Sequence, residues 1–225
     1  MTSRSLLLAI DTSTRFAGLA LYDGDVILSE VYWQSQGNHS VEGMPALVQM
    51  LERQGLGAPD LSAVGVATGP GSFTGLRIGL SMAKGLAQAL AIPIIGIPTL
   101  DILASQHEDQ RRPVWTVIQA GRGRLCAARY ELRRGLWRQR DGFELMTLDG
   151  LVARLVDRCL VCGELSHDEA AYITEHAQGD LVFAKPWQSM RRPACLAELA
   201  WQRFQRGQGD DLATLTPIYL HDPQP

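Results

Sequence analysis

A glycine-rich turn carries the residues of this sequence that could bind an anion. Gly69 and Gly71 flank Pro70, and glycine on both sides of a proline lets the backbone turn sharply and approach a ligand closely. Ser72 or Thr74 can cap the helix expected to follow, and the free N–H groups at a helix start favour a phosphate or carboxylate. A strand-to-helix turn that needs glycine only for its geometry explains the same residues equally well. The spacing matches neither the dinucleotide-binding nor the Walker motif.

A helix expected over residues 73–90 leaves this turn and is apolar on two sides. Its polar residues recur at steps of four, three and four and form one narrow stripe of Arg77, Ser81, Lys84 and Gln88. One apolar side can lie on the chain's own sheet. The other side, lined by Gly75, Gly79 and Ala83, permits the close approach of a second helix. Complete burial within the chain is the alternative to a partner interface.

The elements around this turn repeat in the two halves of the chain. In the first half we expect strands over 6–11, 18–22, 26–32, 63–67 and 93–97, with helices over 40–51, 73–90 and 99–105. In the second half we expect strands over 114–119, 125–130, 136–140 and 159–162, with helices after Asp149, Asp168 and Pro193. Tandem duplication of a unit made of a strand meander and helices explains this order.

The two copies differ at the end of their first strand. A shift of 108 residues places Gln119 where the first copy has Asp11. Magnesium-assisted phosphoryl transfer in a cleft between two such halves needs carboxylates from both sides. The second copy lacks this acid and offers only Cys162–Ser166 in place of the glycine-rich turn. We therefore expect no catalysis by this chain alone.

Composition limits the classes of protein that fit. The 225 residues, 46% of them hydrophobic, can form two cores of about 100 residues each. The net charge of −3 argues against tight unaided binding to a polyanion. The apolar run near the start is too short for a signal peptide, and proline interrupts the longest later run. We expect a soluble, cytoplasmic protein that does not bind a membrane.

Two of the four cysteines have the spacing of metal ligands. Cys159 and Cys162 lie three residues apart, but no second pair of cysteines or histidines completes a zinc site. In a short strand, residues three apart point to opposite faces. We expect Cys126, Cys159, Cys162 and Cys195 to be structural, and we expect no metal site.

Three segments together resemble the TsaB family, also called YeaZ: Ile10–Thr14, Gly69–Gly79 and Pro217–Leu220. The resemblance spans nearly the whole chain in order. It implies the α/β fold of the actin, sugar-kinase and heat-shock-protein superfamily, in which two duplicated domains have mixed sheets flanked by helices. The expected domains are residues 1–108, which carry the partner-binding helices, and residues 109–225, which form a smaller and degenerate copy.

The resemblance also implies a role. TsaB proteins are noncatalytic subunits of the bacterial machinery that transfers threonylcarbamoyl to the adenosine next to the tRNA anticodon. Their paralogue TsaD holds the catalytic metal through a His-x-x-x-His pair, which His39, His107, His167 and His176 do not form here. TsaB binds TsaD, and the ATPase TsaE then joins the pair. We expect this heterodimer, a homodimer when the chain is alone, and contact with tRNA only through the complex.

Two sets of site residues follow from this resemblance and from the helix patterns. The expected partner interface consists of Val41, Met44, Leu47, Val48, Leu51, Gly75, Leu76, Gly79, Leu80, Ala83 and Leu86. Loops that could contact phosphate consist of Asp11, Thr12, Ser13, Thr14, Gly69, Gly71, Ser72 and Thr74. Capping of the strand end by hydroxyls is the plainer interpretation of Asp11–Thr14. We expect no cofactor, and nucleotide binding at the complex interface stays open.

Two further features bear on function. TsaB sequences commonly read Asp-Ala-Arg-Arg-Gly-Glu-Val-Tyr where this chain has Gln119–Cys126, so the missing acid argues against ligand binding by the second domain. Seven arginines, against one acid, predict a basic hairpin that either contacts tRNA phosphates or protects a strand edge: Arg122, Arg124, Arg129, Arg133, Arg134, Arg138 and Arg140. The alternative to the TsaB role is a small ATP-dependent phosphotransferase of the sugar-kinase type, favoured by Asp11 and the glycine-rich turn and opposed by Gln119.

Overall fold

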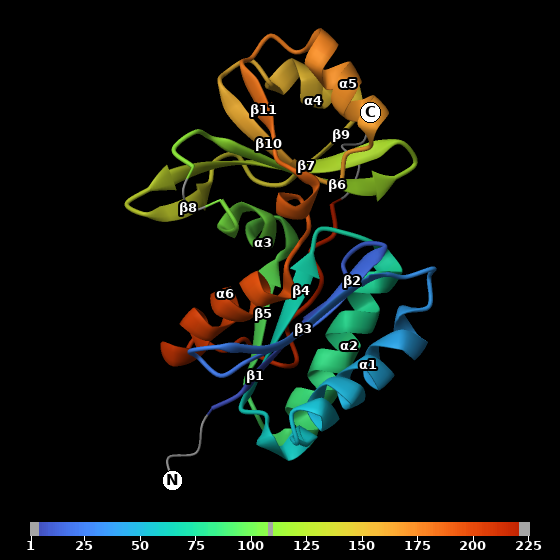
Figure 1. Cartoon of the computed structure of the whole chain (residues 1–225), viewed down its shortest axis with the longest axis vertical. Helices are drawn as coiled ribbons and strands as arrows, with labels where there is room; N and C mark the ends of the chain where they lie inside the picture. The colour runs from blue at the N-terminus through green and yellow to red at the C-terminus, as the bar shows by residue number, and fades with distance from the viewer. Residues whose placement is uncertain (1–4, 108–109, 221–225) are drawn as a thin grey trace. The chain divides into compact units, whose positions relative to one another are not determined.

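The computed structural model describes residues 5–107 and 110–220. The first part of the chain forms a five-stranded sheet of order β3-β2-β1-β4-β5 (Figure 1). Its strands are β1 (Leu7–Asp11), β2 (Phe16–Tyr22), β3 (Ile27–Gln34), β4 (Ala63–Gly69) and β5 (Ile94–Pro98). Strands β1, β2 and β3 form an antiparallel meander, while β1, β4 and β5 run parallel. Parallel strands need crossover helices, and the connections after β3 and β4 supply them.

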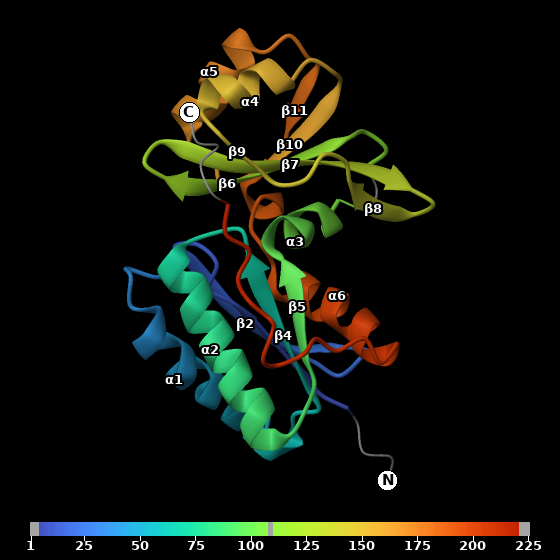
Figure 2. The same cartoon turned by 180° about the vertical axis from the view of Figure 1, so that it is seen from behind.

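Helices cover both faces of this sheet. Figure 2 shows α1 (His39–Arg53) and α2 (Phe73–Leu90) together on one face, with α6 (Pro193–Gln205) on the other. The core under α1 and α2 contains Leu47 and Leu80, packed with β-strand residues such as Ile10 and Val66. On the other face, Gly65 of β4 leaves room for Ala200 of α6, since a Cβ at Gly65 would lie 2.6 Å from the methyl carbon of that alanine. A short 3-10 helix, η1 (Ala58–Asp60), precedes β4.

The second sheet repeats the order of the first. Its path is β8-β7-β6-β10-β11, and β9 pairs with β7. The bounds are β6 (Val114–Gly121), β7 (Arg124–Arg133), β8 (Leu136–Gln139), β9 (Glu144–Met146), β10 (Cys159–Gly163) and β11 (Leu181–Phe183). Again the first three strands, β6, β7 and β8, form an antiparallel meander, while β10 and β11 run parallel to β6. The predicted α/β fold of two duplicated mixed sheets flanked by helices is confirmed.

Three helices flank the second sheet. Leu100 and Leu103 of α3 (Thr99–Ser105) pack into the core on one face. Leu151 of α4 (Leu148–Arg154) and Ile173 of α5 (His167–His176) pack into the core on the other. A 3-10 helix, η2 (Pro186–Gln188), follows β11. The sequence patterns missed the two three-residue strands β9 and β11, because so short a segment shows no alternation.

The compact units of the structure are discontinuous in sequence. The described residues up to Pro98 form one unit with Arg192–Ile218, and Thr99–Arg191 form the other with Tyr219 and Leu220. The helix that follows β5 thus belongs to the unit of the second sheet, and α6 belongs to that of the first. The expected boundary at residues 108 and 109 lies outside the described residues, as do residues 1–4 of the stretch considered for a signal peptide.

The cysteines occupy the positions that the sequence predicts. Cys159 packs on the face of the second sheet that α4 and α5 cover, and Cys162 packs on the face that α3 covers. None of the four cysteines, all of which are among the described residues, forms a disulfide. Burial raises the pKa of Cys159 to about 11 and that of Cys126 to about 12, so both are protonated at neutral pH. Within the residues described, no helix is both long enough and apolar enough to cross a membrane.

Candidate functional site

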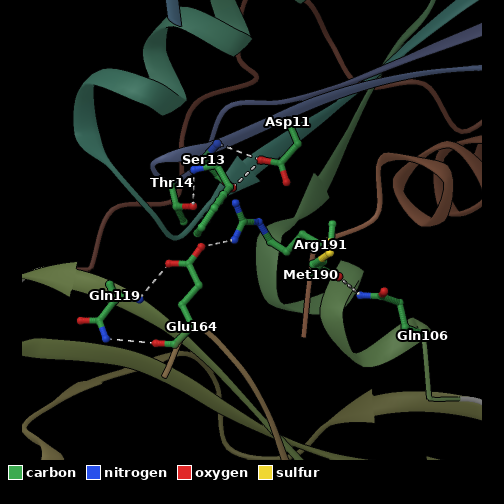
Figure 3. Close-up of polar contacts among 9 residues, drawn as sticks. Asp11, Ser13, Thr14, Gln106, Gln119, Glu164, Met190 and Arg191 are labelled. Atoms are coloured by element: carbon green, nitrogen blue, oxygen red, sulfur yellow. Dashed lines mark hydrogen bonds and ion pairs between the residues drawn. The ribbon is translucent and has the colours of Figure 1, made fainter. Parts of the chain in front are cut away.

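The end of β1 carries the acid and the hydroxyls singled out in the sequence. Asp11 Oδ1 accepts hydrogen bonds from the Ser13 backbone N–H at 2.8 Å and from the Ser13 hydroxyl at 2.5 Å (Figure 3). Asp11, Thr12, Ser13 and Thr14 are all buried. The strand end is therefore a closed turn in which the carboxylate of Asp11 is held by its own neighbours.

The glycine-rich turn packs directly on this strand end. The backbone N–H of Ser72 donates to the carbonyl oxygen of Ser13 at 2.6 Å, and the Thr12 hydroxyl donates to the Gly75 carbonyl oxygen at 2.7 Å. A Cβ at Gly71 would lie 2.1 Å from the Ser13 carbonyl oxygen, and one at Gly75 would lie 2.2 Å from that of Thr12. Both positions require glycine because real Cβ atoms do not approach an oxygen so closely.

The start of α2 is capped from within this turn. The Ser72 side chain accepts from the Gly75 backbone N–H at 3.2 Å, which confirms the predicted N-cap, while Thr74 is exposed in the first turn of the helix. Gly69 has a φ of 103°, which glycine adopts readily. The segment after α6 passes beside it, since the Ile218 backbone N–H donates to the Thr68 carbonyl oxygen at 2.7 Å. These contacts account for the glycines by packing, and phosphate contact stays a prediction.

The corresponding strand end in the second unit is built from side chains. The Gln119 amide nitrogen donates to the Glu164 carbonyl oxygen and to Glu169 Oε1, both at 3.0 Å. Glu164 Oε1 accepts from the Arg191 guanidinium at 2.5 Å, and the Arg191 side chain is 1% exposed (Figure 3). Burial acts to raise the pKa of Glu169, but bonds from Ser166 and Gln119 outweigh it, so the pKa is lowered. Where the first copy has the acid Asp11, the second copy thus has an amide donor, which bonds to the backbone of Glu164 and to the carboxylate of Glu169.

Among residues 5–107 and 110–220, no group of three or more His, Cys, Asp or Glu side chains is placed to hold a metal ion.

The predicted partner interface divides into a buried set, an exposed set and Leu86, which is partly buried against the core of the first sheet. Seven of its residues lie in the chain's own core or against its own strand end: Leu47, Leu51, Gly75, Leu76, Gly79, Leu80 and Ala83. A Cβ at Gly79 would lie 2.3 Å from the Thr12 hydroxyl oxygen. This corrects the expectation that the small residues of α2 face a second helix. They allow close approach, but of the chain's own β1 and of the turn after it.

The exposed set forms an apolar face on the same two helices. On α1, Val41 is 68% exposed and Val48 47% exposed, and Met44 is exposed beside them. On α2, Phe73 is 54% exposed and stacks under the Arg77 guanidinium, whose central carbon is 3.9 Å from the ring centroid. A shallow groove lies here, lined by Ser40, Phe73, Thr74, Arg77, Ile78, Ser81 and Met82.

Sequence analysis missed the α2 part of this face. The sequence pattern placed Arg77 and Ser81 in the narrow polar stripe, and the predicted interface did not include Phe73, Ile78 and Met82. The available signal was their spacing, since residues 74, 78 and 82 and residues 73, 77 and 81 follow the four-residue period of one helix face. We call the surface made of Val41, Met44, Val48 and the groove residues the α1–α2 face.

The two mixed sheets have the same strand order, and in each a capped helix follows the strand next to the first one, β4 or β10. These features define a duplicated α/β protein. The solved structure "YeaZ from Pseudomonas aeruginosa" has this fold: it covers 96% of this chain and 100% of its own, with a TM-score of 0.76 and 23% identity. A sequence model of the family described as "TsaD: tRNA N6-adenosine threonylcarbamoyltransferase" matches residues 27–146.

Sequence relatives specify the family further. The tRNA threonylcarbamoyladenosine biosynthesis protein TsaB of Bacillus subtilis (strain 168) is 38% identical over 217 residues, which are 95% of this chain and 93% of the relative. TsaB of Escherichia coli (strain K12) is 32% identical over 134 residues, 58% of each chain. The chain belongs to the TsaB family, as the sequence motifs predicted.

Proposed function

We propose that this chain acts in tRNA threonylcarbamoyladenosine biosynthesis as a noncatalytic subunit that binds TsaD through the α1–α2 face. The observation that carries the proposal is this face itself. Val41, Met44, Val48 and Phe73 expose apolar side chains on two neighbouring helices, and Phe73 also lines the groove. A contiguous apolar patch on a water-soluble surface is stabilised when a partner covers it. Membership of the TsaB family supports TsaD as that partner.

The geometry of the two strand ends supports a noncatalytic role. Asp11 is engaged by Ser13, and the backbone of Thr12 and Ser13 lies directly against Gly71 and Gly75. In the second unit, Gln119 supplies an amide where phosphoryl transfer would use a carboxylate. TsaE joins the TsaD complex, tRNA is contacted through that complex, and the protein works in the cytoplasm. Without TsaD, two copies of the α1–α2 face pair in a homodimer, because two-fold pairing is the common way to cover such a patch.

Replacement of Val41 and Val48 by aspartate tests the interface. The affinity for TsaD from the same organism should fall about tenfold or more, because an unpaired carboxylate would lose its hydration in an apolar contact. The matched control is Val156→Asp in the second unit, where the valine is 54% exposed. This control should bind TsaD like the wild type in calorimetry. Equal affinities for both variants would remove the α1–α2 face as the binding surface.

An ATPase assay tests the noncatalytic role separately. The purified chain, with and without candidate sugars and magnesium, should show no turnover above a blank. Turnover that a substitution of Asp11 abolishes would instead establish the phosphotransferase alternative.

A further inference from the structure

The arginines of the second sheet gather into one basic surface. Sequence analysis expected seven of them on a single hairpin, but the ten-residue strand β7 separates them. Arg122 lies in the turn from β6, and Arg124 begins β7. The other five lie in the second half of β7, in the turn that follows it, and in or directly after β8, and we call them the basic ribbon: Arg129, Arg133, Arg134, Arg138 and Arg140. This division corrects the expected single basic face.

Strand register places four of the five arginines on one face of the hairpin, and Arg134 lies in the turn between the two strands. Arg129 and Arg133 alternate with inward-facing residues of β7, and Arg138 pairs in register with Glu131 between them. The Arg140 backbone N–H donates to the Arg129 carbonyl oxygen at 2.9 Å, so the pairing continues past β8. Tyr130 and Trp137 point the other way, into the core under α3. The four arginines on this face therefore lie about 7 Å apart along the strand between Arg138 and Arg140 and about 13 Å apart between Arg129 and Arg133.

The charge of the ribbon is only partly compensated. Glu131 is shared, with Arg129 at 3.5 Å, Arg133 at 3.1 Å and Arg140 at 3.8 Å. Arg129 also pairs with Asp157 at 3.2 Å. The side chains of Arg133 and Arg140 are still 57% and 49% exposed, and Arg134 and Arg138 are exposed as well. Three guanidiniums competing for one carboxylate leave a local excess of positive charge on a chain whose net charge is −3.

Protection of a strand edge does not account for this excess. Strand β8 ends the path of the sheet, and charged side chains at an edge prevent pairing with other chains. Charges of either sign do this, and the chain has 24 acidic residues against 21 basic ones. Residues 129–140 nevertheless contain five arginines and one acid, a bias of sign that edge protection by itself does not require.

We propose that the basic ribbon binds the phosphate backbone of tRNA when the chain is assembled with TsaD. Arginine forms charge-assisted bonds to phosphate oxygens, and such contacts hold a nucleic acid in register without reading its sequence. The inference rests on the proposed function, which supplies tRNA as the polyanion. It adds a direct contact to a role in which tRNA was expected only through the partner. The ribbon is too small to bind tRNA tightly by itself, because affinity for a polyanion grows with the number of neutralised phosphates.

The test compares two charge-matched variants of the full chain in complex with TsaD. One variant combines Arg133→Gln, Arg134→Gln and Arg138→Gln in the ribbon. The control combines Arg53→Gln, Arg122→Gln and Arg206→Gln, three exposed arginines outside it. Affinity for unmodified tRNA is measured by fluorescence anisotropy between 50 and 200 mM salt, a range in which counterion release dominates. The chain alone is titrated in the same way at the lowest salt concentration.

The ribbon variant should bind tRNA about tenfold more weakly, and the slope of log affinity against log salt should fall by about two. The control should keep the wild-type affinity and a slope nearer that of the wild type. An unchanged slope in an intact complex overturns the inference. Loss of TsaD or TsaE from the complex on replacing the ribbon also overturns it, in favour of an acidic protein surface as its partner. Failure of the wild-type chain to bind TsaD instead refutes the proposed function, and the ribbon is then judged on the titrations of the chain alone.

Discussion

The two units solve the same structural problem with different chemistry. In both, a glycine ends the strand that runs parallel beside the first strand, β4 or β10, and a serine three residues later caps the next helix: Gly69 with Ser72, and Gly163 with Ser166. At the third helical position the first unit has Gly75, against which the backbone of Thr12 packs. The second has Glu169, which completes a capping box and accepts from Gln119. The first strand is thus fixed to the helix by backbone contact in one unit and by side chains in the other.

This difference has a functional consequence. Backbone contact at Gly71 and Gly75 leaves the outer side of α2 free to carry Phe73, Arg77 and the groove. Helix α5, which Ser166 caps, has no such apolar outer face, since only Ile173 among its residues is buried and the rest are largely polar. The unit with the tight glycine contact is therefore the one that offers a surface to a partner.

The buried ion pair between Arg191 and Glu164 should make the largest single contribution to the stability of the second unit. Arg191→Met leaves the Glu164 carboxylate buried without its cation, so the free energy of unfolding should fall by about 3–5 kcal/mol. The control is Arg158→Met, which breaks the exposed pair with Asp180 and should change the stability little. Urea unfolding followed by fluorescence measures both. Equal effects of the two substitutions would mean that burial does not distinguish these pairs.

In the first unit, the stability should depend on glycine at position 75 and not at position 85 of the same helix. Gly75→Ala puts a Cβ 2.2 Å from the Thr12 carbonyl oxygen and should cost about 2–3 kcal/mol of unfolding free energy. Gly85 lies in the same helix with no atom within 4 Å of its would-be Cβ. Gly85→Ala should therefore stabilise the protein by about 0.5–1 kcal/mol. If both substitutions stabilise the protein, the contact between the strand end and α2 is not as tight as described.

The side-chain amide of Gln119 should contribute less to the stability than these two contacts, and its contribution should depend on pH. Gln119→Ala removes bonds to Glu164 and Glu169 and should cost about 1–2 kcal/mol at pH 7. The pKa of Glu169 is lowered in the folded state, so its contribution to stability is complete above its unfolded pKa and is lost as the pH falls through the folded value. The difference between wild type and variant should thus shrink below about pH 4.3, the usual value for glutamate. A difference that is constant from pH 7 to pH 3 would contradict the role of Glu169.

Local patterns in the sequence predicted the elements that local chemistry determines. The bounds of α2 and its Ser72 cap follow from residue type and periodicity, and the opposite orientation of Cys159 and Cys162 follows from strand geometry. The repeat was visible because both copies keep the meander. The family followed from motifs around the glycine-rich turn, which spans a strand end, a cap and a helix start.

These patterns could not predict which residues contact one another in the folded chain. Small residues at Gly75 and Gly79 indicate that something approaches closely, but their spacing does not say whether it is Thr12 or a second molecule. An apolar helix side can equally face its own sheet or a partner, and only the packing of α1 beside α2 decides that Leu47 is buried while Val48 is exposed. Likewise, no periodicity tells which sheet α6 joins, because a helix with one apolar side fits either.

The placement of α3 and α6 has a consequence for synthesis on the ribosome. The first sheet is complete once Pro98 has been made, yet one of its faces is covered only by α6, which ends at Gln205. More than a hundred residues must emerge before that face is closed, so the nascent chain exposes the apolar underside of β1 and β4 throughout this interval. Chaperones that bind emerging polypeptides would meet it there, and neither unit can be expressed by cutting the gene at a single point.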